Sequence, residues 1–405
     1  MERTLRAHFN AAFTNERYRR VLDRIETRLG CSIPFRVAET PLFIPRDLRL
    51  RLVRHATEIV DEISRPALIA KLADAIPSEL DVPRVDSLCN CIQVDFAIAR
   101  NEAGELDGRL VELQGFPSLY ALTAVEVQAW SEELATMPGL ARPWTCLFND
   151  PDHDSFVRRF RHAVLGGCDP EEVILMDLDP TRQKTYPDFV ATREMVGIDA
   201  VCPTTLERDG RRLFRRVGDR RVQVRRIYNR VVFDELEKSG VTLPFAYNDD
   251  LDVTWFPHPN WYWIWSKNTV PFIEHPSVPR ATLLSRLAEI PDDLENYVLK
   301  PLFSFAGAGV KVDVTRADID AVPSHQRGGW MLQRKIVYEP GIVTPEGHGV
   351  KAEVRMMFMR APDEPKPTLT LNLVRLSRGK MLGVDQNKDF DWVGGTVGIW
   401  PADEA

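Results

Sequence analysis

Within the first 88 residues, apolar residues recur with the period of a helix and charged residues lie between them. In the segments 17–29 and 46–63, apolar residues recur three and four positions apart, with charges between them. Pro45 stands just before the second segment and Asp47 adds an acidic residue near its start, which favours a helix beginning there. The pattern therefore predicts a helical N-terminal region over residues 1–88.

Alternation of apolar and polar residues replaces the helical period after Cys91. Residues 91–99 and 109–114 each alternate, and the stretch 101–108 between them is rich in turn formers. We therefore expect a pair of antiparallel strands. Strict alternation places on one face of the second strand Leu110, Glu112 and Gln114, and on the other Val111 and Leu113.

Acidic residues face each other across this predicted hairpin. Symmetric pairing puts Asp95 roughly opposite Glu112, with Gln114 two positions further along the same face. Like charges in that arrangement destabilise a sheet, and Mg²⁺, which binds carboxylates together with phosphate oxygens, would remove the repulsion. Two interpretations remain open: a magnesium site at Asp95, Glu112 and Gln114, and a solvated hairpin with scattered acids.

Strand-like and helix-like segments alternate between residues 149 and 264. The helix-like segments 157–167 and 188–198 separate the strand-like segments 171–179 and 199–206, which predicts a parallel, doubly wound sheet. A strand-rich region follows from Trp265. The predicted organisation is a mixed α/β (α+β) chain with the parts 1–88, 89–148, 149–264 and 265–405.

The amino-acid composition and net charge limit the kinds of partner that the protein can bind. The 405 residues are 44% hydrophobic, enough for the cores of two or three domains, and the net charge of −7 argues against nucleic acid as a partner. Ten arginines lie between Arg208 and Arg230, but their alternation with apolar residues favours a solvated strand face or a small-anion role. No stretch has the ~18 apolar residues of a membrane helix. Scattered cysteines and a start without an apolar signal region predict a cytoplasmic protein.

A glycine-rich loop follows a lysine within residues 297–314. An apolar strand ends near Lys300, the small residues Ser304, Gly307 and Gly309 follow, and another strand succeeds them. Small residues let backbone N–H groups approach phosphates, while the lysine supplies a point charge. The order fits a flexible hairpin lid over a triphosphate, and it also fits an ordinary hairpin whose glycines serve the turn.

Further polar residues stand in apolar surroundings. Lys267 follows Trp-Ser just before a helix-like segment, and Gln333 lies in a strand that could present it to an adenine edge. Arg355 and Arg375 each interrupt an apolar strand, where a guanidinium needs an anion. That anion could be a phosphate, a substrate carboxylate, or Glu353 in a structural ion pair. The eight histidines form no HExxH or triad-like grouping, so no histidine catalyst is predicted.

In their order along the chain, these motifs resemble those of the circularly permuted ATP-grasp ligases, specifically the synthetase domain of glutathionylspermidine synthase and its relatives. The similar motifs are VDF at 94–96, VELQ at 111–114, VRRIYNRVVFDEL at 224–236, WSKN at 265–268, YVLKPLFSFAGAGV at 297–310 and MLQRK at 331–335. The likeness spans most of residues 40–400. It departs at Gln114, where the family has asparagine, and at Gln93, where the family tends to carry arginine.

The resemblance implies a circularly permuted ATP-grasp fold with an inserted Rossmann-like, parallel-sheet subdomain. It also implies the site: Asp95, Glu112 and Gln114 for Mg²⁺, Lys267 and Lys300 for the phosphates of ATP, Ser304, Gly307 and Gly309 in the lid, and Gln333 toward the adenine. We add Arg355 and Arg375 as catalytic candidates that would neutralise the γ-phosphate or an acyl phosphate.

The implied function is formation of an amide bond between an amine and a small-molecule or peptide carboxylate, dependent on ATP and Mg²⁺, through an acyl phosphate. Catalysis in such an enzyme rests on positioning and charge neutralisation. Gln93 and Gln114 keep a second hypothesis open. It is a catalytically idle ATP-grasp-like protein that binds a nucleotide or peptide and regulates a partner.

Overall fold

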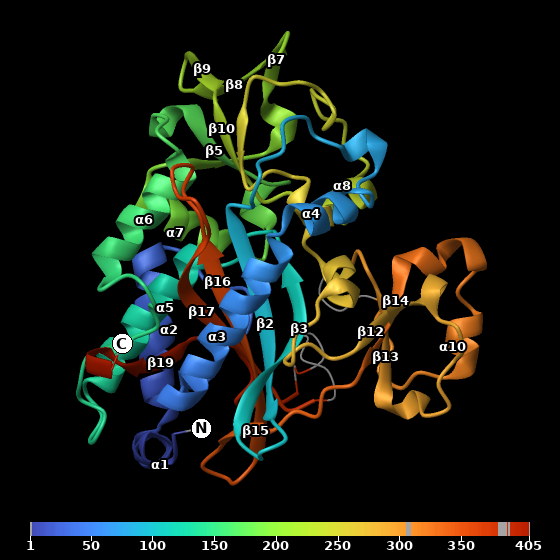
Figure 1. The fold of residues 1–405 in the computed structure, drawn as a ribbon. Coiled ribbons are helices and arrows are strands. Elements are labelled where there is room, and N and C mark those ends of the chain that lie inside the picture. Colours follow the sequence, from blue (N-terminus) through green and yellow to red (C-terminus); the bar gives the residue numbers. More distant parts are fainter. Residues whose placement is uncertain (1, 305–308, 380–386, 388, 405) are drawn as a thin grey trace.

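An antiparallel sheet forms the centre of the computed structural model, which describes residues 2–304, 309–379, 387 and 389–404 (Figure 1). Its strand order is β18-β17-β16-β2-β3, and β15 pairs with β16. The strands are β2 Cys91–Arg100, β3 Leu106–Gln114, β15 Pro340–Val343, β16 Gly349–Met359, β17 Thr368–Ser377 and β18 Gly394–Thr396. The sheet therefore joins two distant parts of the sequence.

The first third of the chain supplies the helices α1 Arg3–Ala12, α2 Asn15–Leu29, α3 Arg46–Ile63, α4 Pro66–Ala73 and α5 Tyr120–Leu134. Of these, α3 and α5 pack against this sheet, and α2 packs against α5. The predicted helix at 46–63 coincides with α3, which contacts β3 and β16. α2 begins after Thr14, whose side chain accepts a hydrogen bond from the N–H of Arg17, and ends at Gly30 in the left-handed conformation. Because residues 91–99 of β2 are buried on both faces, polar side chains of this strand need partners within the protein.

Glu133 of α5 connects that helix to α2. Its side chain is fully buried, and its carboxylate accepts hydrogen bonds from Arg17, Arg20 and Arg24 at distances between 2.6 and 3.2 Å. Burial raises the pKa of this carboxyl, but the three arginines outweigh burial and lower the pKa to about 2. Because glutamate in an unfolded chain has a pKa of about 4.3, the stability that Glu133 contributes is present above that pH. It is lost as the pH falls toward 2.

Replacement of Glu133 with glutamine is expected to lower the free energy of unfolding by about 2 kcal/mol at pH 7. This is less than the lowered pKa alone implies, because solvent screens the charges of the partly exposed arginines. The difference from the wild type should shrink as the pH falls from about 4.5 to 2. Urea unfolding followed by circular dichroism at several pH values measures both effects. Glu132→Gln is the matched control, because that carboxylate is half exposed and binds Arg24 and Arg28 at the surface. Equal stability of Glu133→Gln and wild type at pH 7 would contradict the prediction.

A parallel sheet lies at one end of the molecule, at the top of Figure 1. Its order is β11-β10-β5-β6, and every pairing in it is parallel. The elements are α6 His153–Leu165, β5 Val173–Met176, α7 Tyr186–Val196, β6 Asp199–Val201, β10 Arg226–Asn229 and β11 Thr254–Phe256. The alternation of strand and helix along residues 149–264 correctly predicted parallel pairing in this part of the chain.

The arginine-rich segment forms an antiparallel sheet of β7 Glu207–Asp209, β8 Arg212–Val217 and β9 Arg220–Val224. Its exposed arginines bind acidic residues from neighbouring segments. Examples are Arg208 with Asp249 at 2.6 Å and Arg220 with Glu171 at 2.7 Å. The segment is thus a network of surface ion pairs.

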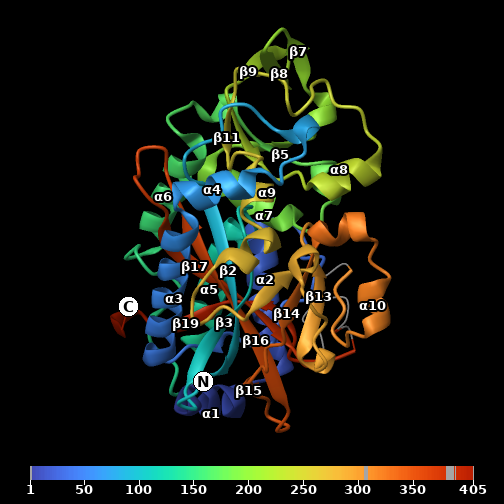
Figure 2. The ribbon, with the colours of Figure 1, turned by 45° about the vertical axis from the view of Figure 1, so that its right-hand side comes forward.

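A smaller sheet of order β12-β14-β13 lies beside β3, to its right in both ribbon views (Figures 1 and 2). Its strands are β12 Ala281–Leu283, β13 Tyr297–Pro301 and β14 Trp330–Arg334, with α10 Arg316–Asp320 outside them. The remaining elements are β1 Leu42–Phe43, β4 Trp144–Thr145, α8 Phe233–Ser239, α9 Trp261–Ile264, β19 Gly398–Pro401 and the 3₁₀ turns η1 Ser78–Leu80, η2 Pro170–Glu172, η3 Pro180–Arg182, η4 Pro203–Thr205, η5 Lys267–Phe272, η6 Leu284–Arg286, η7 Leu294–Asn296, η8 Ser324–Gly329 and η10 Ala402–Glu404. Among the described residues, none of the helices combines the length and hydropathy that crossing a bilayer requires.

Candidate functional site

A bulge in β3 decides which side chains face the site. Asp95 pairs with Glu112, as the hairpin geometry predicted, but Phe96 pairs with Leu110, so Val111 has no partner across the ladder. The prediction of strict alternation was therefore wrong at this point. Leu110 and Leu113 are both buried in the core, whereas Glu112 is partly exposed. The extra residue separates Leu110 from the face that carries Glu112.

Asp95 is enclosed by two arginines on the neighbouring strands. Arg355 lies directly across from it on β16 and donates from Nε and from one terminal nitrogen to its two carboxylate oxygens, each at 2.7 Å. Arg375 of β17 also donates to one of these oxygens. Burial raises the pKa of Asp95, but the two guanidinium charges outweigh burial and lower the pKa below its ordinary value. At 1% exposure, Asp95 is an ionised anchor for Arg355 and Arg375.

A structural ion pair with Glu353 is one interpretation of the arginines in these apolar strands. Such a pair is present, because a terminal nitrogen of Arg375 lies 3.0 Å from Oε2 of Glu353. Tyr338 donates its phenolic hydrogen to the other oxygen of Glu353 at 2.5 Å. Arg355, in contrast, binds Asp95 and has 9% of its side chain exposed, while 30% of the Arg375 side chain is exposed. Arg375 is therefore the more accessible of the two catalytic candidates.

Lys267 and Lys300 come from separate segments and meet near Glu112. Lys267 begins η5, directly after Ser266 of a capping box, and its Nζ lies 3.7 Å from Oε2 of Glu112. It also donates to the carbonyl oxygen of Ser304. Lys300 of β13 donates to the carbonyl oxygen of the bulged Val111 at 3.2 Å. Both lysines are buried.

The environment of Lys300 favours a bound anion. Burial lowers the pKa of its ammonium to about 8, while Glu112 acts to raise this pKa and the nearby charge of Lys267 acts to lower it. Two buried ammonium groups that repel each other are stabilised when an anion binds between them. This pair is therefore an electrostatic arrangement suited to phosphate or carboxylate.

A small cavity of about 40 Å³ opens beside Glu112 and Lys267, and Lys300 is not among its lining residues. Its lining combines polar side chains from the predicted site with apolar side chains, namely Glu112, Gln114, Ser266, Lys267 and Ser304 with Leu113, Phe116, Tyr262, Trp265, Leu302 and Phe303. Sequence reasoning missed Phe116, because an aromatic residue near a strand end gives no signal that separates a cavity wall from a core. Tyr262 belongs to the aromatic run 255–265, whose pattern favours packing between domains and leaves a substrate-facing wall as the alternative.

The residues predicted to bind Mg²⁺ differ in their availability. Gln114 donates its amide N–H to Oε1 of Gln93 at 2.7 Å and to the carbonyl oxygen of Phe116 at 3.2 Å. Glu112 and Gln114 both line the cavity, and their side-chain oxygens are of the type that Mg²⁺ takes as ligands. Asp95 does not line the cavity, and its oxygens already accept hydrogen bonds from arginines.

Gln333 has the unsatisfied hydrogen-bonding capacity that a nucleotide base requires. It lies on β14 between β12 and β13 and is 1% exposed, and within the described part of the chain neither its amide nitrogen nor its amide oxygen has a hydrogen-bond partner. Buried amide groups without partners are rare, and an adenine edge offers both a donor and an acceptor. Gly309 has a φ of +74°, a conformation that favours glycine, and Gly307 lies outside the described residues.

Comparison with known proteins supports the fold. No protein-family model and no curated protein sequence matches the chain. Among solved structures, the chain is similar to a glutathione synthetase-like effector from Globodera pallida in its apo form, with a TM-score of 0.60 and 12% sequence identity. The match covers 89% of this chain and 93% of that one. The chain thus has a glutathione synthetase-like, ATP-grasp-like fold.

Proposed function

We propose that the protein is an ATP- and Mg²⁺-dependent ligase that joins a carboxylate to an amine through an acyl phosphate, in the manner of glutathionylspermidine synthase. The observation that carries the proposal is the convergence of Lys267 and Lys300 on Glu112, with Glu112 and Lys267 lining one cavity. Two cations and a carboxylate in this arrangement suit a triphosphate with its metal ion. The order of the chain, with Glu112 ahead of both lysines, supports a circularly permuted ATP-grasp arrangement.

The predicted ligands fit the nucleotide and the metal ion to different degrees. Lys267 and Lys300 would bind the phosphates of ATP, and Gln333 would bind the adenine edge. Glu112 and Gln114 would hold Mg²⁺, which would neutralise phosphate charge. We propose that Asp95, whose oxygens accept from arginines, positions Arg355 and Arg375 rather than binding the ion. Because small-molecule sites commonly measure about 300–1,000 Å³, ATP binding requires the cavity to open by movement of residues 302–304.

The proposed reaction has two steps. An oxygen of the donor carboxylate attacks the γ-phosphorus, and ADP leaves. The amine nitrogen then attacks the acyl carbon, phosphate leaves and the nitrogen loses a proton. Arg375, which is partly exposed, is placed to neutralise the transferred phosphate, and exclusion of water by the closed site protects the acyl phosphate from hydrolysis.

The proposal is tested with purified protein, ATP and Mg²⁺. Thermal unfolding with and without Mg-ATP measures binding, and phosphate release is then followed with pools of small carboxylates, peptides and amines. Release that requires both an added carboxylate and an added amine, and that is lost in Glu112→Ala, supports the ligase. Absence of any thermal shift with ATP or ADP rules out a nucleotide site.

A catalytically idle, nucleotide-binding regulator is the second candidate. The engagement of Asp95 by two arginines favours it, because the predicted magnesium site then retains a single carboxylate, Glu112. This candidate predicts a thermal shift with Mg-ATP and no phosphate release with any pair of acceptor and donor. The two measurements together therefore separate the candidates.

The affinity for ATP is expected to depend on pH through Lys300. Its pKa of about 8 means that the ammonium loses its charge as the pH rises above 8, so the dissociation constant for ATP should rise between pH 7 and pH 9.5. Lys300→Arg keeps its charge over this range and should show a smaller rise. Isothermal titration calorimetry at constant Mg²⁺ measures both proteins. Parallel pH profiles for the two would show that Lys300 does not contact the nucleotide.

A further inference from the structure

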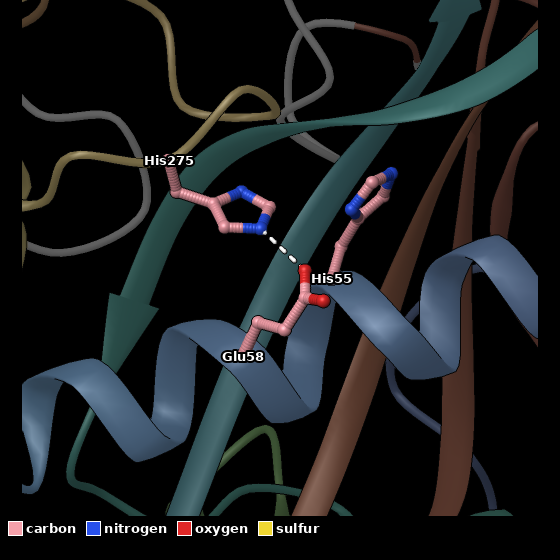
Figure 3. A group of neighbouring side chains, drawn as sticks. All are labelled: His55, Glu58 and His275. Atoms are coloured by element: carbon pink, nitrogen blue, oxygen red, sulfur yellow. Dashed lines mark hydrogen bonds and ion pairs between the residues drawn. The ribbon is translucent and has the colours of Figure 1, made fainter.

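A group of side chains outside the proposed nucleotide site has the composition of a metal centre. His55 and Glu58 stand three residues apart on α3, and His275 lies in the loop that follows η5 (Figure 3). Each residue offers one ligand atom, and these atoms lie within 4.8 Å of one another. The three side chains turn toward a common point from two separate segments of the chain.

His55 directs an unpartnered nitrogen at this point. Its Nε2 lies 2.9 Å from Oδ1 of Asp107. A carboxylate oxygen accepts a hydrogen bond from Nε2–H, and in that tautomer Nδ1 is the nitrogen with the free electron pair that a metal ion needs. Nδ1 is buried and has no hydrogen-bond partner among the described residues, His55 is 6% exposed, and one ring nitrogen faces His275 and Glu58 in Figure 3.

His275 and Glu58 complete the group. Nε2 of His275 lies 2.8 Å from Oε2 of Glu58, and its Nδ1 lies 2.7 Å from the hydroxyl oxygen of Ser277. The side chain of His275 is 9% exposed, whereas that of Glu58 is 52% exposed, so an ion can reach the group from solvent on the Glu58 side. Both histidines thus have one nitrogen held by a neighbour and the other directed at Glu58.

We propose that Nδ1 of His55, the carboxylate of Glu58 and Nε2 of His275 bind a zinc ion. Two imidazoles and one carboxylate are a common zinc ligand set that leaves a fourth position for water. Neutral imidazole selects zinc and similar transition metals over Mg²⁺, which prefers oxygen ligands. Asp107 then acts as the outer carboxylate that fixes the tautomer and orientation of a metal-binding histidine.

Binding requires three local changes. With Zn–N distances of about 2.0–2.1 Å, ligand atoms in a tetrahedral site lie roughly 3.3 Å apart. The Glu58 oxygen must therefore move away from Nε2 of His275, which lies 2.8 Å from it, and wider separations must shorten, which the exposed Glu58 side chain permits. The proton on Nε2 of His275 must move to Nδ1. The resulting Nδ1–H would then donate a hydrogen bond to the hydroxyl oxygen of Ser277. The backbone N–H of Ser277, which donates to Nδ1 at 3.1 Å, must then turn away.

The ion would connect three segments. Two ligands lie on α3, the third lies in the loop after η5, and Asp107 lies on β3. The same loop already pairs with β3, because the N–H of Leu110 donates to the carbonyl oxygen of Ser277 at 2.8 Å. Glu112 and Lys267 belong to β3 and η5, so zinc would fix the relative position of the two elements that form the cavity. The zinc proposal stands without the ligase, because it rests on other residues.

The test uses the full chain, stripped with a chelator and titrated with zinc chloride in competition with a chromogenic zinc indicator. We expect one zinc ion per chain and a rise in the midpoint of thermal unfolding that zinc causes and magnesium does not. Glu58→Gln and His275→Asn should each weaken zinc binding more than 100-fold. Asp107→Asn should weaken it about 10- to 100-fold, because it removes an outer partner only.

His162→Asn is the matched control. His162 binds Asp363 at 2.7 Å in an exposed histidine–carboxylate pair, and the residues that the structure describes add no third ligand there, so the variant should bind zinc as the wild type does. Circular dichroism of each variant without zinc verifies that it is folded. Unchanged zinc affinity in both Glu58→Gln and His275→Asn, or the absence of zinc binding by the folded wild type, would overturn the proposal and leave a hydrogen-bonded cluster.

Discussion

Asp95→Asn is expected to lower the free energy of unfolding by about 3–5 kcal/mol, the largest stability change predicted for this chain. Asparagine has nearly the same shape as aspartate, so the loss comes from the charge. Without the carboxylate, the guanidinium of Arg355 is left buried without a counter-ion, and Arg375 retains Glu353 alone. Urea unfolding followed by tryptophan fluorescence measures the change.

The control for this prediction is Asp391→Asn. Asp391 binds Arg36 at 3.2 Å and its side chain is 81% exposed, so its loss should cost less than about 1 kcal/mol. Combining Asp95→Asn with Arg355→Gln should recover part of the stability, because the second change removes the unpaired charge. Stability of Asp95→Asn within 1 kcal/mol of the wild type would show that Asp95 does not anchor the arginines. Stabilisation of the wild type by Mg²⁺ alone, absent in Asp95→Asn, would assign Asp95 to the metal instead.

Lys267→Met is expected to remove most of the stabilisation that Mg-ATP gives. A hydrogen bond between charged groups contributes about 1.5–3 kcal/mol, which corresponds to a dissociation constant roughly 10- to 100-fold higher. At an ATP concentration about 100 times the wild-type dissociation constant, the wild type gains about 2.7 kcal/mol, and the variant should gain only about 0.4–1.4 kcal/mol. Thermal unfolding over a series of ATP concentrations measures the difference, and phosphate release should fall about 100-fold or more.

Lys311→Met provides the comparison for Lys267→Met. Lys311 lies just after the glycine-rich loop that follows Lys300. Its side chain is 58% exposed and lies 3.9 Å from Asp318, so its removal should leave ATP binding unchanged. Because Lys267 lies near Glu112, the stability of Lys267→Met without ATP must be measured as well. Equal stabilisation of Lys267→Met and wild type by Mg-ATP would place the nucleotide elsewhere.

Much of the local structure could be predicted because each element has its own hydrophobic period. The helix at 46–63, the antiparallel strands around Asp95 and Glu112, and the parallel strands of residues 149–264 all follow from spacing within short windows. The segment that supplies Lys300 could also be found, because a lysine followed by a glycine-rich stretch is conspicuous in the sequence. These features depend on neighbours along the chain. Lys267 alone gives a weak signal, and its role comes from the resemblance.

Other features depend on partners that local periodicity does not specify. Asp95 and Arg355 are 260 positions apart, so only the order of strands in the sheet reveals that the predicted metal ligand is held by an arginine. The bulge at Val111 changes which side chains of β3 share a face, because one extra residue shifts the alternation. His55 and His275 give no joint signal in the sequence, and they meet because α3 and the loop after η5 pack on the same strand. The sequence thus determined the elements and their polar residues, and the tertiary structure decided the partners, because the pairing of distant segments depends on how whole elements pack.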